Sequence, residues 1–266
     1  MRKIRVIVHY NRSLRNYLEL IWEFFINDFK IRYKKSLLGV LWAVIRPLLQ
    51  FYVLYNIWTY FGHAKPGHAY YILAGIMVYN IFSETLVYSM SALLNKSHII
   101  LKIYFPREAV VFGASLVAQI NFFFNMLVLL GLLVLSGNSV MNAVSFVVHV
   151  FAAGEVAYFG ALGLGVWLSI WYVRFRDLNH LVQLFLYLLF WLIPVMYPLD
   201  LIKNSQLFPV VVHNPLTWVV LFFKDGLTSG HYHWVLLARA LLVFVVIFML
   251  GMLSFKRRIA YVAEYY

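Results

Sequence analysis

Six long apolar stretches are the feature that most constrains this chain. An α-helix needs about 20 mainly apolar residues to cross a bilayer, and each stretch approaches or exceeds that length. They run from Leu37 to Tyr60, Tyr70 to Leu94, Val110 to Leu135, Val140 to Trp171, Leu178 to Tyr197 and Trp234 to Phe255. Only helices and closed barrels satisfy their backbone polar groups in lipid, and apolar runs of this length favour helices. We therefore predict an all-α integral membrane protein with six transmembrane helices.

Composition excludes a soluble fold. Hydrophobic residues make up 64% of the chain and charged residues 12%, whereas soluble domains have roughly 45–50% and about 25%. The chain contains no cysteine, so it offers no disulfide, thiolate nucleophile or cysteine metal site. Nucleotide-binding, serine-hydrolase and zinc-protease motifs are absent from the sequence. The histidines are scattered without a carboxylate cluster, so we predict no metal site.

The segment before the first span predicts an amphipathic helix. From Arg12 to Ile31, apolar residues such as Leu18, Ile21 and Phe25 recur at helical spacing, and polar residues such as Glu19 fall on the other face. This pattern favours a helix lying in the membrane interface. A helix packed on a soluble partner remains the alternative.

The segment from Leu207 to Phe223 is apolar but interrupted. Pro209 and His213-Asn214-Pro215 leave two halves that are each too short to span a membrane. We predict a pair of re-entrant or interfacial half-helices on the exterior face, between spans five and six.

Basic residues set the predicted orientation, because cytoplasmic loops carry the Lys/Arg excess. With six spans, the cytoplasmic side holds the residues before Leu37, Lys96, Lys102, Arg107, Arg174, Arg176 and the tail Lys256-Arg257-Arg258. The other side holds only Lys65, Lys203 and Lys224. Both termini are therefore predicted to be cytoplasmic. One transmembrane domain covers 1–266, with an N-terminal interfacial part (1–36), a six-helix region (37–255) and a tail (256–266).

Four ionisable residues lie within predicted spans, where charge is costly and function is the default hypothesis. They are Arg46, Glu84, Glu155 and Arg239. Arg46 lies nine residues beyond Leu37, or about 13 Å deep in an upright helix, so it should face protein or water. An Arg-carboxylate pair between helices and contact with an anionic substrate both remain open for Arg46. For the other three we favour a structural role.

The first predicted span also contains several aromatic residues and a proline. Most aromatics should form the usual interfacial belt, but Tyr52, Tyr55 and Trp58 are candidates to line a path for a sugar or polyol chain. Pro47 is tolerable in a span where a neighbouring helix or a wet cavity satisfies the carbonyl that it frees.

The short loop from Ser97 to Arg107 mixes apolar and basic residues before a proline. It predicts either a stubby helix beneath the membrane, suited to docking on another protein, or a plain connection.

Several short motifs together resemble a known family. RYKKSLLGVLWAVIRPL at the first span, YFPRE before the third, RFRDL after the fourth and the external HNPL are similar, in order and placement, to the membrane subunits of type-2 ABC exporters. Within these, the chain looks like polysaccharide and wall teichoic acid exporter permeases. The resemblance implies a homodimer in the bacterial cytoplasmic membrane, with two copies of a separate ATPase that bind ATP and Mg. The chain itself would be no enzyme and would hold no cofactor.

The resemblance also assigns roles to residues, position by position. The cytoplasmic gate would include Arg32, Tyr33, Lys34 and Lys35, and the ATPase-coupling segments would include Lys102, Ile103, Tyr104, Phe105, Pro106, Arg107, Arg176 and Asp177. In the family the residue before the first-span proline is usually uncharged or acidic, so Arg46 is a departure. Orientation alone explains the gate cations, and recruitment of an anionic lipid headgroup is the alternative.

The leading functional hypothesis is export of an anionic polymer carried on a polyprenyl diphosphate lipid. Wall teichoic acid ranks ahead of O-antigen or capsular polysaccharide, and no nucleic-acid partner is expected. Two alternatives come from other classes. One is an integral membrane transferase acting on polyprenyl lipids, and the other is a proton-driven transporter that uses Glu84 and Glu155.

Overall fold

The computed structural model describes residues 14–34, 36–61 and 67–259. The regular elements of these residues are all helices. They are α1 (Leu14–Tyr33), η1 (Gly39–Leu41), α2 (Trp42–Tyr60), α3 (His68–Asn95), α4 (Ser97–Ile100), α5 (Glu108–Leu135), α6 (Val140–Arg174), α7 (Leu178–Leu192), η2 (Leu199–Ile202), α8 (Phe208–His213), α9 (Pro215–Phe222), α10 (Gly226–Ser229) and α11 (Trp234–Arg258).

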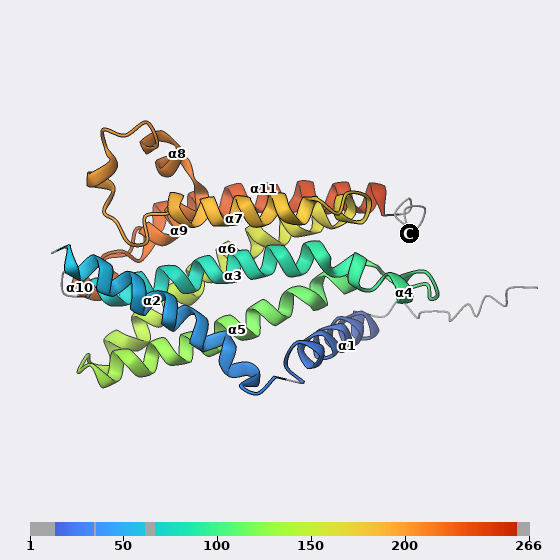
Figure 1. Ribbon diagram of the computed structural model, residues 1–266, viewed down its shortest axis with the longest axis horizontal. Coiled ribbons are helices and arrows are strands. Elements are labelled where there is room, and N and C mark those ends of the chain that lie inside the picture. Colours follow the sequence, from blue (N-terminus) through green and yellow to red (C-terminus); the bar gives the residue numbers. More distant parts are fainter. Residues whose placement is uncertain (1–13, 35, 62–66, 260–266) are drawn as a thin grey trace, which may run out of the picture.

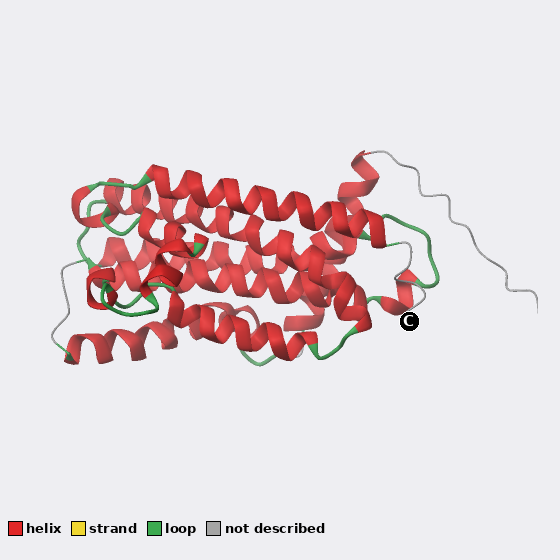
Figure 2. Cartoon of the chain, turned by 90° about the horizontal axis from the view of Figure 1, so that it is seen from above, coloured by secondary structure: helices red, strands yellow, loops and turns green. Residues whose placement is uncertain are grey.

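The long helices form an elongated bundle around α3 (Figures 1 and 2). α3 packs on α5 and α6, α6 packs on α11, and α1 packs on α5. The helices differ in how much of their most apolar 18-residue stretch is buried. This buried share is 72% in α3, but only 17% in α2 and 22% in α11. The core therefore lies around α3, and α2 and α11 form its exposed sides.

Small residues let α6 approach its neighbours closely. A Cβ on Gly163 would lie 2.5 Å from the Cα of Phe248 on α11, and a Cβ on Gly251 of α11 would collide with the carbonyl oxygen of Gly163. Contacts of this kind hold helices together in lipid, where apolar side chains gain little by leaving the solvent. The α6–α11 pair is thus fixed by backbone contact.

Several basic residues lie together at one end of the bundle. α4 and the C-terminal end of α11 lie at one end and α10 at the other (Figure 1). Arg107 Nη1 donates to the carbonyl oxygen of Ile259 at 2.6 Å, and the guanidinium of Arg258 lies 4.8 Å from the ring centroid of Trp171. The loop before α5, the end of α6 and the end of α11 therefore meet at one end, as the charge pattern predicts.

Within the described residues, five helices are long and apolar enough to cross a membrane. The helix at the fifth predicted span is shorter than expected. The predicted helix from Leu178 to Tyr197 ends at Leu192, and Ile193 has extended backbone angles, φ −101° and ψ 129°. Pro194 explains this end, because proline disfavours helical angles at the residue before it and donates no backbone hydrogen bond. The long α6, by contrast, continues unbroken for 35 residues.

The predicted N-terminal helix is present as α1, and it packs on protein over one face. Phe24 and Phe25 are buried, and a Cβ on Gly113 of α5 would lie 2.6 Å from the Cβ of Phe24. Leu14 and Leu18, which the periodicity placed on the apolar side, remain exposed. Interfacial placement of that exposed side stays a prediction.

The segment that we predict to be external is divided at the predicted position. α8 ends at His213 and α9 begins at Pro215, and Asn214 caps α9 by accepting a hydrogen bond from the Leu216 N–H at 3.0 Å. Proline at the first helical position strengthens this start. The break between two half-helices is confirmed, and their re-entrant placement stays a prediction.

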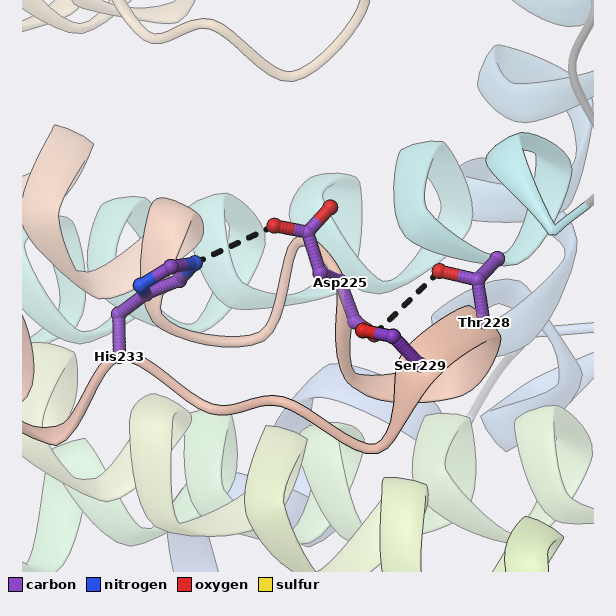
Figure 3. Close-up of polar contacts among 4 residues, drawn as sticks. All are labelled: Asp225, Thr228, Ser229 and His233. Atoms are coloured by element: carbon purple, nitrogen blue, oxygen red, sulfur yellow. Dashed lines mark hydrogen bonds and ion pairs between the residues drawn. The ribbon is translucent and has the colours of Figure 1, made fainter.

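The connection from α9 to α11 is held by local polar contacts (Figure 3). His233 Nε2 lies 3.2 Å from Asp225 Oδ2, while the hydroxyls of Thr228 and Ser229 donate to the Asp225 carbonyl oxygen. The Ser229 hydroxyl is thus engaged by the backbone and not by the imidazole. These side-chain contacts stabilise a turn. They do not place the serine hydroxyl beside the histidine, as a nucleophile and its general base would require.

Candidate functional site

A polar pocket of about 520 Å³ lies between the α1–α2 junction and helices α3 and α5. Its lining includes Arg32, Arg46, Asn80, Glu84 and Asn121. The pocket therefore gathers two of the predicted functional cations and one of the intramembrane carboxylates. Because it is bounded by the predicted gate and the first span, we take it as the candidate functional site.

A chain of hydrogen bonds connects the gate to the bundle across this pocket. The Tyr33 hydroxyl donates to Asn121 Oδ1 at 2.8 Å, and Asn121 Nδ2 donates to Glu84 Oε2 at 2.7 Å. Burial raises the pKa of Tyr33 above its ordinary value, so its hydroxyl is a donor at neutral pH. One asparagine thus links α1 to α3 through α5.

The two arginines of the pocket have different surroundings. The Arg32 guanidinium lies 3.7 Å from the ring centroid of Tyr88, which is a cation–π contact. Among the described residues, no carboxylate lies within ion-pair distance of Arg46. Arg46 lines the pocket and is exposed in the single chain. The predicted ion-pair alternative for Arg46 thus finds no partner here, and its contact with substrate stays a prediction.

Pro47 lies inside α2, and a neighbouring helix compensates for it. Proline removes the hydrogen bond to the carbonyl four residues earlier, which is that of Ala43. Asn125 Nδ2 on α5 donates to this Ala43 oxygen at 3.2 Å, and it also donates to the Asn121 carbonyl at 3.0 Å. The expectation that a neighbouring helix takes up the freed carbonyl is confirmed.

The predicted coupling loop has an exposed tip and an anchored flank. Tyr104 is 73% exposed and Ile103 47%, whereas Phe105 is 8% exposed and packs on Phe24 of α1 with ring centroids 5.4 Å apart. Helix α4 covers only Ser97–Ile100, so most of the loop is irregular and the predicted stubby helix is a single turn. Lys102 is exposed, and Pro106 and Arg107 are partly buried.

An ion pair ties this loop region to α1. Lys96 Nζ lies 2.5 Å from Asp28 Oδ1, and both side chains are largely buried. Lys96 follows α3 directly, so the pair connects the end of α3 to the predicted gate helix. Arg176 and Asp177, the second predicted coupling segment, lie exposed between α6 and α7.

The remaining predicted residues do not converge on the pocket. Tyr52 and Trp58 lie about 240° and about 120° around α2 from Arg46 at 3.6 residues per turn, and Trp58 lines a second pocket at the far end. Tyr55 stacks on Phe51. Tyr52, Tyr55 and Trp58 therefore share one face of α2, on the side away from Arg46, and their contact with substrate stays a prediction.

The other charged residues predicted to have a role lie in separate environments. Lys34 is exposed, and Lys35 lies outside the described residues. Glu155 accepts a hydrogen bond from Gln119 Nε2 on α5, whereas Arg239 is exposed on α11. Within the described residues, no three His, Asp or Glu side chains gather as a metal site would require.

Asn121, Asn125 and the Asp28–Lys96 pair were not singled out in the sequence. The sequence does hold a signal for the two asparagines, since they lie one helical turn apart in a mainly apolar span that also contains Ser115 and Gln119. Amides in a span mark positions that bind another helix.

Comparisons with known proteins agree with the motifs. No family model matches the chain. It is 26% identical over 204 residues to an O-antigen export system permease protein RfbA of Klebsiella pneumoniae, which covers 76% of this chain and 78% of the relative. It is 27% identical over 197 residues to the RfbA permease of Myxococcus xanthus, which covers 73% of this chain and 74% of the relative.

These similarities confirm the predicted resemblance to permease subunits of type-2 ABC exporters. A second Klebsiella pneumoniae protein of the same name is 24% identical over 204 residues. The apolar helices and these relatives together support a multi-pass membrane protein.

Proposed function

We propose that this chain is the transmembrane subunit of an ATP-driven exporter that moves a lipid-linked cell-surface polysaccharide across the bacterial cytoplasmic membrane. The observation that carries the proposal is similarity over about three quarters of the chain to permeases named for O-antigen export. The order of the two candidate substrates is accordingly reversed, with an O-antigen type of polysaccharide ahead of wall teichoic acid. No relative among these is named for teichoic acid.

The proposed complex contains two copies of this chain and two copies of a separate cytoplasmic ATPase, which would supply the ATP and Mg sites. The exposed tip Lys102–Tyr104 and the exposed pair Arg176 and Asp177 support an ATPase contact at the basic end. The little-buried sides of α2 and α7 are where a second copy would add contacts.

The anchored flank of the coupling loop supports a mechanical route to the gate. Movement of the ATPase would displace the tip, and Phe105 on Phe24 and Lys96 on Asp28 would carry that displacement to α1. Helix α1 reaches the candidate site through Tyr33. In this mechanism the pocket beside Arg46 is where an anionic headgroup would be received.

The test is ATP hydrolysis and export by the complex reconstituted in vesicles with its ATPase and a lipid-linked polysaccharide. Tyr104→Ala is expected to lower export-coupled ATP hydrolysis without unfolding the chain, because Tyr104 is exposed. Tyr60→Ala, an exposed tyrosine at the opposite end, is the matched control. Arg46→Ala should lower export while leaving assembly intact.

One result would contradict the exporter assignment, and another would contradict only the role of Arg46. Transport without any ATPase partner, and its loss on collapse of a proton gradient, would favour the proton-driven alternative. Unchanged export by Arg46→Ala would remove that residue from the substrate path but leave the exporter assignment in place.

A further inference from the structure

A second pocket, of about 260 Å³, lies at the end of the bundle opposite the coupling loop. It is enclosed by the end of α2, the start of α3, the segment after α7 and the end of α9. Its lining combines aromatic rings with two charged side chains, namely Trp58, His68, Tyr71 and Tyr197 with Asp200 and Lys224. The volume suits one sugar ring with a few waters, and not an oligosaccharide.

The tyrosines of this pocket are held in place by their hydroxyls. Tyr71 is buried and donates to the Pro194 carbonyl oxygen at 2.7 Å, and Tyr197 donates to the Trp191 carbonyl oxygen at 3.0 Å. Val195 fits against Gly75, where a Cβ would lie only 2.8 Å from a Val195 methyl group. The early end of α7 therefore places a fixed, non-helical wall against α3.

Aromatic rings continue from one element to the next along this wall. The ring centroids of Trp58 and His68 lie 6.4 Å apart, and those of His68 and Tyr71 lie 5.8 Å apart. Asp200 and Lys224 add one negative and one positive charge to the lining, and Asp200 Oδ1 also lies 2.5 Å from Nζ of Lys203. The pocket thus offers apolar ring surface with balanced polar groups, and not a concentration of cations.

This combination discriminates between two kinds of polymer. A pyranose ring has an apolar C–H face that packs on an aromatic ring, and hydroxyls at its edge that hydrogen-bond to charged groups. An acyclic polyol phosphate has no such flat face, and its negative charge calls for a cationic site. The lining therefore matches the ring sugar.

We propose that this pocket binds a single pyranose unit of the exported polymer at the outer end of the bundle. The inference rests on the proposed export function and deepens it, because it assigns a substrate built from sugar rings. Trp58 supplies the stacking surface, and Asp200 and Lys224 bind ring hydroxyls.

The test measures binding to the full-length chain in lipid nanodiscs by saturation-transfer NMR, with a panel of methyl pyranosides and with ribitol 5-phosphate. We expect about millimolar affinity for at least one pyranoside, typical of a single small ring. Trp58→Ala and Tyr197→Ala should each weaken it about five- to tenfold. Trp167→Ala, an exposed tryptophan of α6, is the matched control and should bind as wild type does.

Three outcomes would overturn the inference. These are no binding by any pyranoside, equal or tighter binding of ribitol 5-phosphate, and pyranoside binding that survives both pocket substitutions. Export by the vesicle complex is measured on the same variants. Normal export together with no pyranoside binding defeats the pocket alone, whereas no ATP-driven export by the wild-type complex defeats the proposed function.

Discussion

The four-helix body of α3, α5, α6 and α11 and the adjoining helices α1 and α2 are held by different sets of contacts. The core is joined by apolar side chains and by backbone contacts such as that between Gly163 and Gly251. α1 also packs apolar side chains such as Phe24 on α5, and α1 and α2 add polar contacts, including the Asp28–Lys96 ion pair and the hydrogen bonds of Asn121 and Asn125. Close packing tolerates little change in side-chain volume, whereas a polar contact depends on both of its partners. The four-helix body is therefore expected to be sensitive to added volume, and the α1–α2 side to the loss of single polar partners.

The largest effect is expected from a substitution that breaks the core. Gly163→Leu places a side chain against the backbone of α11, so the chain should lose more than about 3 kcal/mol of stability or fail to assemble. Gly131→Leu on α5 is the matched control, because a Cβ there meets nothing within 4 Å. Thermal unfolding in detergent, followed by size-exclusion chromatography, distinguishes the two. Equal stability of both variants would show that α6 and α11 are not closely packed.

A smaller effect is expected where α1 is tied to α3. Asp28→Ala leaves the largely buried Lys96 without its partner, which should lower stability by about 2–3 kcal/mol. Asp28→Ala with Lys96→Met removes both charges and should recover more than half of that loss. Urea unfolding of the detergent-solubilised variants provides the measurement. A double variant no more stable than Asp28→Ala alone would contradict a direct ion pair.

The smallest effect tests how α5 supports the proline of α2. Asn125→Leu removes the donor to the Ala43 carbonyl and should cost about 1 kcal/mol. Pro47→Ala restores a backbone N–H that can reach the same carbonyl, so the Asn125→Leu cost should fall in that background. The double-mutant cycle, measured by thermal unfolding, isolates the coupling between the two positions. If the stability losses of the two substitutions simply add, the Asn125 hydrogen bond to Ala43 does not compensate for Pro47.

The fold was largely predictable because long apolar runs leave few alternatives. The predicted spans correspond to α2, α3, α5, α6 and α11 within a few residues at most ends. The fifth predicted span is longer than α7 because Ile193–Tyr197 continues the apolar pattern. Hydropathy does not include the effect of Pro194 on the backbone. Where the pattern broke with a cap signal, as at Asn214, the prediction of two half-helices was correct.

The candidate site was less predictable than the fold. The sequence singles out Arg46 and Glu84 because charges are rare in spans, and the structure brings both to one pocket. It does not reveal that Asn121 joins Tyr33 to Glu84, because that contact depends on how three helices are rotated about their axes. The sequence proposes both Arg46 and Trp58 for the substrate path, and the structure places them in separate pockets near opposite ends of α2.

The early end of α7 has a consequence for the lipid around the protein. A helix of 15 residues is about 22 Å long, which falls about 8 Å short of a typical hydrocarbon core about 30 Å thick. Bilayers adapt to a short span by local thinning, at a fraction of a kcal/mol per Å. If α7 crosses the membrane as predicted, we expect the acyl chains beside it to be compressed and the water surface to dip toward the wall at Pro194. Bilayer thickness would then affect the stability of this face of the protein.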